Sequence, residues 1–405
     1  MSSDVHAHDL NPNVAAMRPS ATLAMSARAK ALVRAGRPVI ELSAGEPDFA
    51  TPAPIREAGI RAIEEGFTRY TANAGMPELR EAIAKKLKED NGLDYTPAEI
   101  LCSNGAKQSV AQAVLVLCRP GDEVVIPAPY WVSYPEMARL AGAEPVIVET
   151  GPATGYRMRP EDLDAALTER TRVVMMNSPS NPTGAVYSRA ELEALAEVLR
   201  PREDVIVVSD EIYEHVLYDA EHVAFAALPG MRERTVTVNG FSKAFAMTGW
   251  RLGYLAAPGW IATAAGTVQG QFTSAPSTIT QRAGIAALAM DRGPVREMVR
   301  AFRERRDFVL GALEEIPDVL CPTPEGAFYV FPDVSAYFGR TAPDGRVIRN
   351  SEALCFYLLE AHDVALVPGS GFGADYGLRI SYAAGMDDLR EAMRRIADGL
   401  AALRG

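Results

Sequence analysis

The chain has 405 residues, 48% of them hydrophobic and 23% charged, values typical of a folded globular protein and not of a disordered or fibrous one. Lys and Arg number 41 against 52 Asp and Glu, and the net charge of −11 argues against nucleic acid and anionic membranes as partners. No apolar run approaches the roughly 18 residues needed to cross a bilayer, so no membrane span is predicted.

The N-terminal segment and the cysteines indicate where the protein resides. The chain starts with polar residues and lacks the apolar core of a signal peptide, so we expect a flexible tail over residues 1–17 and no export. The cysteines show no CxxC spacing, which is typical of reduced thiols in a cytoplasmic protein: Cys102, Cys118, Cys321 and Cys355. The histidines include no i, i+4 pair on a predicted helix, so no metal site is predicted: His6, His8, His215, His222 and His362.

Three helices are predicted ahead of the main sheet. The first covers about 21–35 and has no sheet of its own, so it packs on the C-terminal part of the chain or contacts a partner subunit. Thr51 and Pro52 suit the N-cap and first position of a second helix that ends at Gly66. A third helix begins at Pro77 and ends at Gly92.

From residue 100 to about 257, short apolar runs alternate with amphipathic helical stretches such as 190–200. This alternation predicts an α/β fold in which helices surround a large, mostly parallel seven-stranded sheet. The strand candidates are 99–103, 123–127, 145–149, 172–177, 204–209, 235–239 and 251–257.

The rest of the chain is predicted to form a smaller α+β domain over 291–405. It combines a long charged helix with strand-like segments and two further helices, one at 352–361 and one at the C-terminus. The strand-like segments are 327–331, 364–368 and 378–383. We expect 18–50 to pack with this small domain and 51–290 to form the large one.

Two candidate functional residues follow predicted strands, where ligands of open parallel sheets bind. Asp210 ends an apolar strand, where an unpaired carboxylate is costly, so it should meet a cation or hydrogen-bond donors; alternatively it caps the next turn. Lys243 lies among small and apolar residues. Desolvation there would lower the lysine pKa and favour the neutral amine that attacks carbonyls, the alternative being a surface lysine.

A phosphate-sized anion site is predicted near two other residues. Gly105 opens a helix after a strand, where the main-chain N–H groups attract an anion. Arg251 lies eight residues after Lys243, between Gly249 and Gly253, which leave room for close approach of the backbone.

Three motifs together resemble those of class I aminotransferases, which are fold-type I pyridoxal phosphate enzymes: S-P-S-N-P-T-G (178–184), S-D-E-I-Y (209–213) and S-K-A-F-A-M-T-G-W-R-L-G-Y (242–254). Four more segments are most similar to bacterial aspartate aminotransferases of the Ib subgroup: R-P-S-A-T (18–22), S-A-G-E-P-D-F (43–49), G-A-K-Q (105–108) and P-Y-W-V-S-Y-P-E-M (129–137). Some members of that subgroup also transaminate prephenate. The resemblance runs from Pro19 to the last helix.

The resemblance implies that the chain binds pyridoxal 5'-phosphate. Lys243 would form the Schiff base and carry a proton between substrate Cα and cofactor C4′, and Asp210 would keep the ring nitrogen protonated. Tyr213 and Asn181 would donate hydrogen bonds to the cofactor phenolate, or else serve as a core aromatic and a turn residue. Trp131 would stack on the ring. The phosphate would be held by Gly105, Ala106, Ser242 and Arg251, together with Tyr70 from the second subunit of a homodimer.

Arg379 is the candidate for the substrate α-carboxylate, because an arginine among apolar strand residues needs an anion, although that anion could be an internal carboxylate. The resemblance assigns the second carboxylate to Lys107, with hydroxyls from Ser20 and Thr22. Alternatively, Lys107 is a structural lysine that caps a loop, and Arg18 would instead favour a larger dicarboxylate such as prephenate. It adds three residues beside the substrate: Gly45, Trp131 and Asn181.

The implied reaction moves the amino group of aspartate to 2-oxoglutarate, giving oxaloacetate and glutamate, with prephenate as a second acceptor that yields arogenate. One alternative is another fold-type I enzyme, such as an aromatic or alanine aminotransferase or a β-lyase. A second alternative is a catalytically silent binding protein. The presence of Lys243, and the short stretch ahead of the first helix, argue against it.

Overall fold

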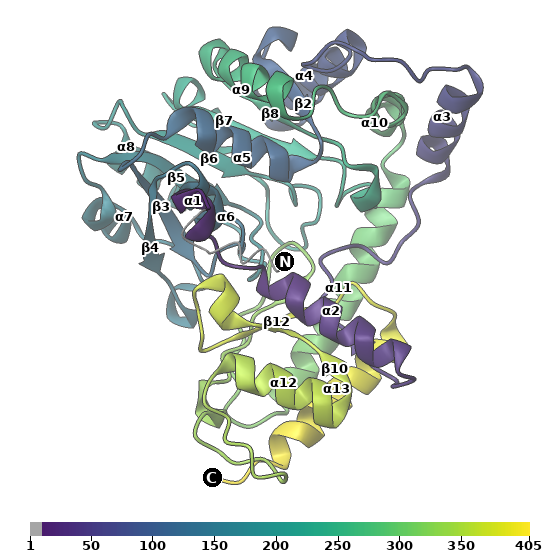
Figure 1. Ribbon diagram of the computed structural model, residues 1–405, viewed down its shortest axis with the longest axis vertical. Helices are drawn as coiled ribbons and strands as arrows, with labels where there is room; N and C mark the ends of the chain where they lie inside the picture. The colour runs from purple at the N-terminus through teal and green to yellow at the C-terminus, as the bar shows by residue number, and fades with distance from the viewer. Residues whose placement is uncertain (1–9) are drawn as a thin grey trace, which may run out of the picture.

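The computed structural model describes residues 10–405, and its largest element is a seven-stranded sheet in the order β2-β8-β7-β6-β5-β3-β4 (Figure 1). The strands are β2 (Ile100–Ser103), β3 (Glu123–Ala128), β4 (Glu144–Glu149), β5 (Thr171–Asn177), β6 (Ile206–Asp210), β7 (Thr235–Gly240) and β8 (Gly253–Ala256). Every strand predicted between 99 and 257 is confirmed, with small shifts at the ends.

Strand β8 runs antiparallel to both of its neighbours, β2 and β7, whereas the other strand pairs of the sheet are parallel. Gly253 at the start of β8 lies opposite Ser103 and Gly240, the last residues of β2 and β7. The chain just before β8 therefore reaches the same edge of the sheet as the residues that follow the parallel strands.

Helices cover both faces of this sheet. One face packs against apolar residues of α5 (Ala106–Leu117), α6 (Tyr134–Leu140) and α9 (Gly259–Phe272). The other faces apolar residues of α3 (Ala53–Glu64), α4 (Pro77–Asn91), α7 (Pro160–Ala166), α8 (Arg189–Leu199) and α10 (Thr278–Ala289). The predicted helix at 190–200 is α8, which buries Leu192, Leu195 and Leu199 at helical spacing.

One predicted helix start is wrong. Helix α3 begins at Ala53 and has no side-chain cap, because Thr51 is used elsewhere. The Thr51 hydroxyl donates to the carbonyl of Ala246 (2.6 Å) and accepts from the indole N–H of Trp250 (3.1 Å). Helix α4 begins at Pro77 and ends at Gly92, whose φ of 67° is the left-handed conformation expected there.

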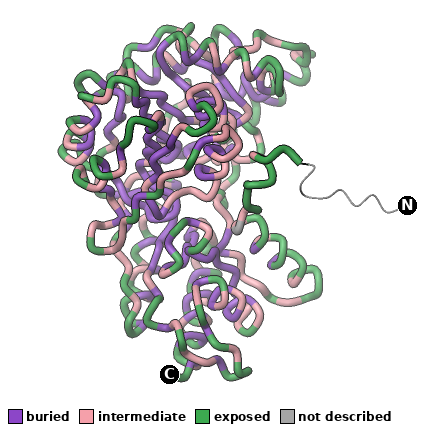
Figure 2. Tube along the Cα trace, turned by 60° about the vertical axis from the view of Figure 1, so that its left-hand side comes forward, coloured by how far each residue is buried: buried purple, intermediate pink, exposed green. Residues whose placement is uncertain are grey.

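The C-terminal part contains α11 (Gly293–Glu314), α12 (Ser351–His362), α13 (Met386–Ala401) and an antiparallel sheet in the order β11-β12-β9. Its strands are β9 (Tyr329–Val330), β11 (Val367–Pro368) and β12 (Leu378–Ser381). An N-terminal strand, β1 (Ile40–Glu41), pairs in parallel with β10 (Val364–Ala365). The expected α+β composition is confirmed. Figure 2 shows buried residues in the interior of both the upper and the lower part of the molecule.

Helix α2 (Ala21–Arg34) lies across the C-terminal part (Figure 1). Its Met25 and Ala29 are buried in the same core as the strands and helices of that part. Arg28 forms an ion pair with Glu360 of α12 (3.3 Å). This helix therefore packs on the C-terminal part.

Part of the predicted N-terminal tail is helical. Helix α1 (Pro12–Ala15) is a single turn beside α6, and the Asn13 amide donates to the Leu140 carbonyl (3.2 Å). Residues 1–9, with His6 and His8, lie outside the described residues. No helix within 10–405 is long and apolar enough to cross a membrane. All four cysteines are free thiols.

Candidate active site

A cavity of about 320 Å³ lies at the edge of the large sheet where β5 and β6 end. That volume is in the range of small-molecule sites. Its wall brings together most of the residues predicted from the sequence: Ser20, Thr22, Gly45, Ala106, Lys107, Trp131, Asn181, Asp210, Tyr213, Ser242, Lys243, Arg251 and Arg379.

The amine of Lys243 lies inside this cavity and donates to the carbonyl oxygen of Gly45. Burial lowers the pKa of Lys243 to about 8, and the nearby Arg379 acts in the same direction. A minor fraction of the amine is therefore neutral near neutral pH, much more than for a lysine with the usual pKa. Lys243 is not an ordinary surface lysine.

Asp210 is buried at the end of β6 and its two carboxylate oxygens have different donors. Oδ2 accepts from the hydroxyl of Tyr134 (2.8 Å), and Oδ1 accepts from the main-chain N–H of Ile212 (3.2 Å). The alternative role of Asp210 as a cap of the next turn thus accounts for Oδ1 only. Burial raises the pKa of Asp210 to about 6, against the lowering effect of these two donors.

Two buried tyrosines stand beside Asp210 and Lys243. The hydroxyls of Tyr213 and Tyr329 are 2.8 Å apart and the rings meet edge to face. Burial raises the pKa of both hydroxyls, so both remain protonated and able to donate a hydrogen bond. Tyr213 is therefore a core aromatic whose polar atom faces a ligand-sized space.

The predicted anion site is formed by the start of α5 and by Arg251. Gly105 precedes α5 with a φ of 84°, and a Cβ built on it would lie 2.3 Å from Nη2 of Arg251. Arg251 donates to the carbonyls of Thr248 (2.9 Å) and Asn104 (3.3 Å), and no carboxylate pairs with it among residues 10–405. The antiparallel direction of β8 is what brings Arg251 to this edge of the sheet.

Arg379 is buried in β12 without a carboxylate among the residues that the structure describes. It donates from Nη1 to Oδ1 of Asn181 (3.0 Å) and from Nη2 to the Ser43 carbonyl (2.6 Å), while its Nε has no partner. The internal ion pair considered as an alternative is therefore absent from 10–405. A buried guanidinium of this kind suits a carboxylate ligand.

Lys107 lies at the mouth of the cavity with its amine 4.9 Å from the centre of the Trp131 ring. Burial by its neighbours lowers the pKa of Lys107, and Arg251 adds to the effect. Ser20 caps α2 by accepting from the N–H of Leu23 (3.4 Å), so its oxygen also has a structural use. Thr22 lines the same wall.

Three predicted residues are not among those that line the cavity: Gly105, which precedes α5, Tyr70 and Arg18. Tyr70 is 99% exposed, as a residue offered to another subunit would be. Arg18 is exposed, and its main-chain N–H donates to Oε2 of Glu136 (2.7 Å).

Sequence reasoning did not single out several residues of the wall. Tyr134 lay inside a quoted motif, three residues after Trp131, and that spacing was the available signal. Tyr329 appeared only as a strand aromatic, and no sequence signal indicated that its hydroxyl meets Tyr213. The others are Leu23, Val132, Asn177, Ile212 and Thr248.

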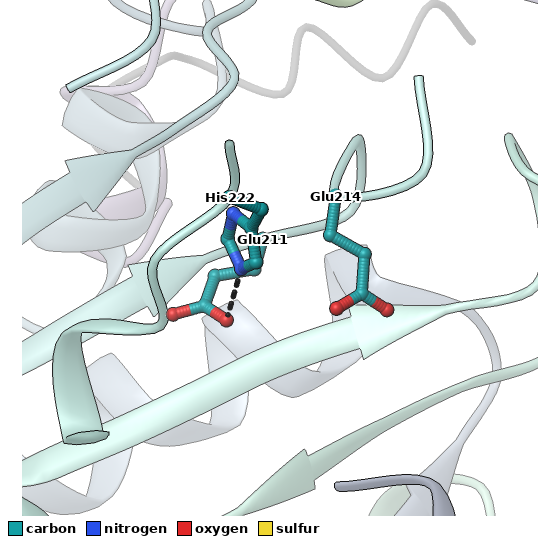
Figure 3. A group of neighbouring side chains, drawn as sticks. All are labelled: Glu211, Glu214 and His222. Atoms are coloured by element: carbon teal, nitrogen blue, oxygen red, sulfur yellow. Dashed lines mark hydrogen bonds and ion pairs between the residues drawn. The ribbon is translucent and has the colours of Figure 1, made fainter. Parts of the chain in front are cut away.

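A group of possible metal ligands lies outside the cavity: Glu211, Glu214 and His222, whose ligand atoms are within 4.8 Å of one another (Figure 3). Their atoms already have protein partners. Glu211 bonds His222 (3.0 Å) and Ser209 (2.8 Å), and the Glu214 carboxylate forms an ion pair with Lys86. A lysine against one of the three ligands disfavours a cation there.

The cavity combines a lysine of lowered pKa, a buried carboxylate that lacks a cation, and an anion site at a helix start. Together these suit an enzyme that acts through a phosphorylated cofactor with a basic ring nitrogen. Comparison with known proteins gives the family. The sequence profile described as "Aminotransferase class I and II" matches residues 37–398.

The relatives agree. The chain is 56% identical over 400 residues to "Aspartate aminotransferase" of Pinus pinaster (98% of this chain, 81% of the relative), and 49% identical over 389 residues to "Aspartate/prephenate aminotransferase" of Cereibacter sphaeroides (96% and 97%). The crystal structure of the aspartate aminotransferase from Rhizobium meliloti superposes with a TM-score of 0.94 at 44% identity, covering 97% of this chain and 99% of that one. The chain belongs to the class I and II aminotransferase family, whose cofactor is pyridoxal 5'-phosphate.

Proposed function

We propose that this protein is an aspartate aminotransferase that moves the amino group of L-aspartate to 2-oxoglutarate. The observation that carries the proposal is a pair of cations in the cavity, Arg379 and Lys107. Neither has a carboxylate partner among residues 10–405. Two unpaired cations in the cavity that holds Lys243 match the two carboxylates of aspartate, glutamate and their oxo acids. The names of the relatives support the same reaction.

The residues present fit pyridoxal 5'-phosphate. Gly105 lets the Arg251 guanidinium approach the start of α5, where a Cβ would collide with it, and Arg251, Ser242 and the Ala106 N–H would hold the phosphate. Asp210 lacks a cation, which the ring nitrogen would supply. When bound, the cofactor supplies an aldehyde for the amino group and a ring that withdraws electrons from substrate Cα.

The protein groups would then act as follows. Lys243 takes the proton from substrate Cα, because its lowered pKa leaves it neutral for part of the time. Asp210 holds a positive charge on the ring nitrogen. Tyr213 and Asn181 donate hydrogen bonds to the ring oxygen; with Oδ1 of Asn181 engaged by Arg379, the Nδ2 end is the donor. Trp131 stacks on the ring.

The substrate would be held by its two carboxylates. Arg379 binds the α-carboxylate through its guanidinium, with the Gly45 main chain and Asn181 beside it. Lys107 binds the second carboxylate, with hydroxyls of Ser20 and Thr22 nearby. Both cations lie in a partly buried site, where electrostatic attraction is stronger than in water.

The active unit would be a homodimer in which Tyr70 of one subunit reaches the phosphate of the other. The support is the 99% exposure of Tyr70 in the single chain together with its position in a family motif. Sedimentation of the protein would show a dimer. A catalytically active monomer would contradict this assignment.

Prephenate would be a second amino acceptor. The support is the resemblance of the motifs and the names of two relatives, at 49% and 46% identity, as aspartate/prephenate aminotransferases. An assay with glutamate or aspartate as donor and prephenate as acceptor would yield arogenate. Absence of turnover would limit the substrates to aspartate, glutamate and their oxo acids.

The test of the main proposal is visible absorption of the purified protein with pyridoxal 5'-phosphate. The cofactor band should change on addition of aspartate or glutamate and change little with alanine. Lys243→Ala should bind the cofactor without forming the same band. A protein that stays colourless with added cofactor would contradict the proposal, and a response to alanine equal to that of aspartate would favour an alanine aminotransferase.

A further inference from the structure

Buried acidic residues lie at the end of β6 and directly after it, and they differ in their position relative to the cavity. Asp210 lines the cavity together with Tyr213, whereas Glu211 and Glu214 are buried outside its wall. Figure 3 shows the Glu211 carboxylate bonded to His222 and the Glu214 carboxylate beside them. Three buried carboxylates within five residues require compensation, because each would be costly without a partner.

Glu211 is tied to the strand end that carries Asp210. Its Oε1 accepts from the Ser209 hydroxyl (2.8 Å) and from the N–H of Phe225 (3.2 Å), and its own N–H donates to the carbonyl of Val238 (2.8 Å). Ser209 and Glu211 are the two neighbours of Asp210 in the chain. A bond between their side chains therefore fixes the backbone from which the Asp210 carboxylate projects.

Glu214 has its own cation. It forms an ion pair with Lys86 and accepts from the Asn91 amide (2.9 Å), so that Lys86 holds the pKa of Glu214 well below its usual range although burial would raise it. His215 lies 3.2 Å from Glu214, but burial lowers the pKa of His215 to about 4, so it adds no charge.

His222 is then the cation that remains for Glu211. Its Nε2 lies 3.0 Å from Oε2 of Glu211, and its Nδ1 has no hydrogen-bond partner among the described residues. Burial would lower the pKa of His222, but the Glu211 carboxylate outweighs it and raises the pKa. The other groups acting on His222 are Glu214 and Lys86, whose charges oppose each other.

The charge on Glu211 matters for the cavity because it also raises the pKa of Asp210. An uncompensated Glu211 would favour protonated Asp210, which attracts a ring cation less strongly. With His222 protonated, Glu211 and Glu214 are both neutralised. Asp210 is then the carboxylate of this segment that still needs a cation.

We propose that His222 is a positioning residue that neutralises Glu211 and thereby keeps Asp210 ionised for the ring nitrogen of the cofactor. The inference rests on the proposed function, since it assigns a role toward the same bound group. The two residues involved, His222 and Glu211, do not line the cavity.

The test is the dissociation constant of pyridoxal 5'-phosphate, measured by fluorescence titration of the cofactor-free protein, with circular dichroism in the cofactor band. His222→Gln keeps a hydrogen-bond donor for Glu211 and removes the charge. At about pH 5, below the pKa of Asp210, we expect about tenfold weaker binding, because a rise of one unit in that pKa lowers the ionised fraction of Asp210 about tenfold there. The double variant Glu211→Gln/His222→Gln removes both charges and should regain most of the affinity.

If His222 acted only through packing, the double variant would bind the cofactor at least as weakly as His222→Gln does. That result would overturn the inference, as would wild-type affinity in His222→Gln. Glu211→Gln alone provides a test that does not depend on the folding of the His222 variant. Its affinity should equal or exceed that of the wild type, and a loss would count against the inference.

Glu123→Gln is the matched control. Glu123 is equally buried but lies at the start of β3, where it accepts from the Thr168 hydroxyl (2.5 Å) and pairs with Arg170. It should lower the melting temperature without changing cofactor affinity. If the wild type itself does not bind the cofactor, the proposed function fails, which is distinct from a failure confined to the His222 variants.

Discussion

The Tyr134 hydroxyl donates to Oδ2 of Asp210 across 2.8 Å, and both groups are buried. This bond stabilises the ionised carboxylate against the effect of burial. Tyr134→Phe would leave Asp210 with one donor, the N–H of Ile212. Because a hydrogen bond to a charged group is worth about 1.5–3 kcal/mol, we expect cofactor affinity to fall roughly ten- to hundredfold.

The control for that change is Tyr357→Phe, which removes a buried hydroxyl bonded to the Gly399 carbonyl (3.1 Å), outside the cavity wall. It should leave the dissociation constant of the cofactor unchanged. Equal losses in both variants would mean that Tyr134 acts through general stability and not through Asp210.

The pKa of Asp210 gives a stability change with a defined sign. Burial raises it from 3.8 to about 6 in the cofactor-free protein, so the unfolded state loses its proton first and stability falls as pH rises from about 4 to about 6. The full cost above pH 6 is about 3 kcal/mol. Asp210→Asn should therefore stabilise the cofactor-free protein by up to about 3 kcal/mol at pH 7.5 and little at pH 4.

Urea unfolding of the cofactor-free Asp210→Asn protein at the two pH values, at one protein concentration, measures this difference. The same variant should bind the cofactor more weakly, because it offers no negative charge to the ring nitrogen. A stability change of the same size at pH 4 and pH 7.5 would show that the buried charge is not its cause.

Gly105→Ala should block the phosphate site. The new Cβ would lie 2.3 Å from Nη2 of Arg251, so the guanidinium would have to leave its position. Gly121→Ala is the control: its φ is 89°, close to the 84° of Gly105, but a Cβ there meets nothing within 4 Å. Both glycines have a positive φ, but only Gly105→Ala places a Cβ against Arg251, so only that variant should lose affinity for pyridoxal phosphate in a titration.

Arg379→Lys should weaken substrate binding and spare the cofactor. Lysine keeps the charge but loses the planar pair of donors that a carboxylate accepts. We expect KM for aspartate to rise about ten- to hundredfold while the dissociation constant of pyridoxal phosphate stays near that of the wild type. Steady-state kinetics measure the effect on the substrate, and a cofactor titration measures the effect on cofactor binding. An unchanged KM would contradict the assignment of Arg379 to the substrate site.

Lys107→Ala should lower kcat/KM for aspartate and glutamate more than for alanine, because its amine is assigned to the second carboxylate. Its 4.9 Å approach to Trp131 predicts a smaller effect on all substrates through the position of the ring. Parallel kinetics with the three amino acids measure the ratio. Equal losses for alanine and aspartate would contradict the assignment.

The large sheet could be predicted because each buried strand is a short apolar run bounded by polar or turn residues, as at 172–177 and 235–239. Asp210 and Lys243 could be predicted for the same reason, since they follow strands whose carboxyl ends meet at one edge. Most of the remaining wall residues were predicted from the resemblance of the motifs. Local sequence was therefore sufficient to predict those site residues that lie directly at the end of a strand.

The direction of β8 could not be predicted, because a buried strand has the same apolar pattern in either direction. Yet that direction places Arg251 at the cavity edge. Tyr134 and Tyr329 were missed because their hydroxyls meet partners far away in the chain. Thr51 was assigned as a cap on local grounds, and a contact with Ala246, 195 residues later, took its hydroxyl instead.

The Nη2 of Arg379 donates to the Ser43 carbonyl across 336 residues of sequence, and β1 pairs with β10 close by. During synthesis, all seven strands of the large sheet have left the ribosome before β10 and β12 are made. A nascent chain of that length already holds Lys243, Asp210 and Arg251 but not Arg379. Under the proposed assignment, the residues that would hold the cofactor are thus made before the residue that would bind the substrate carboxylate.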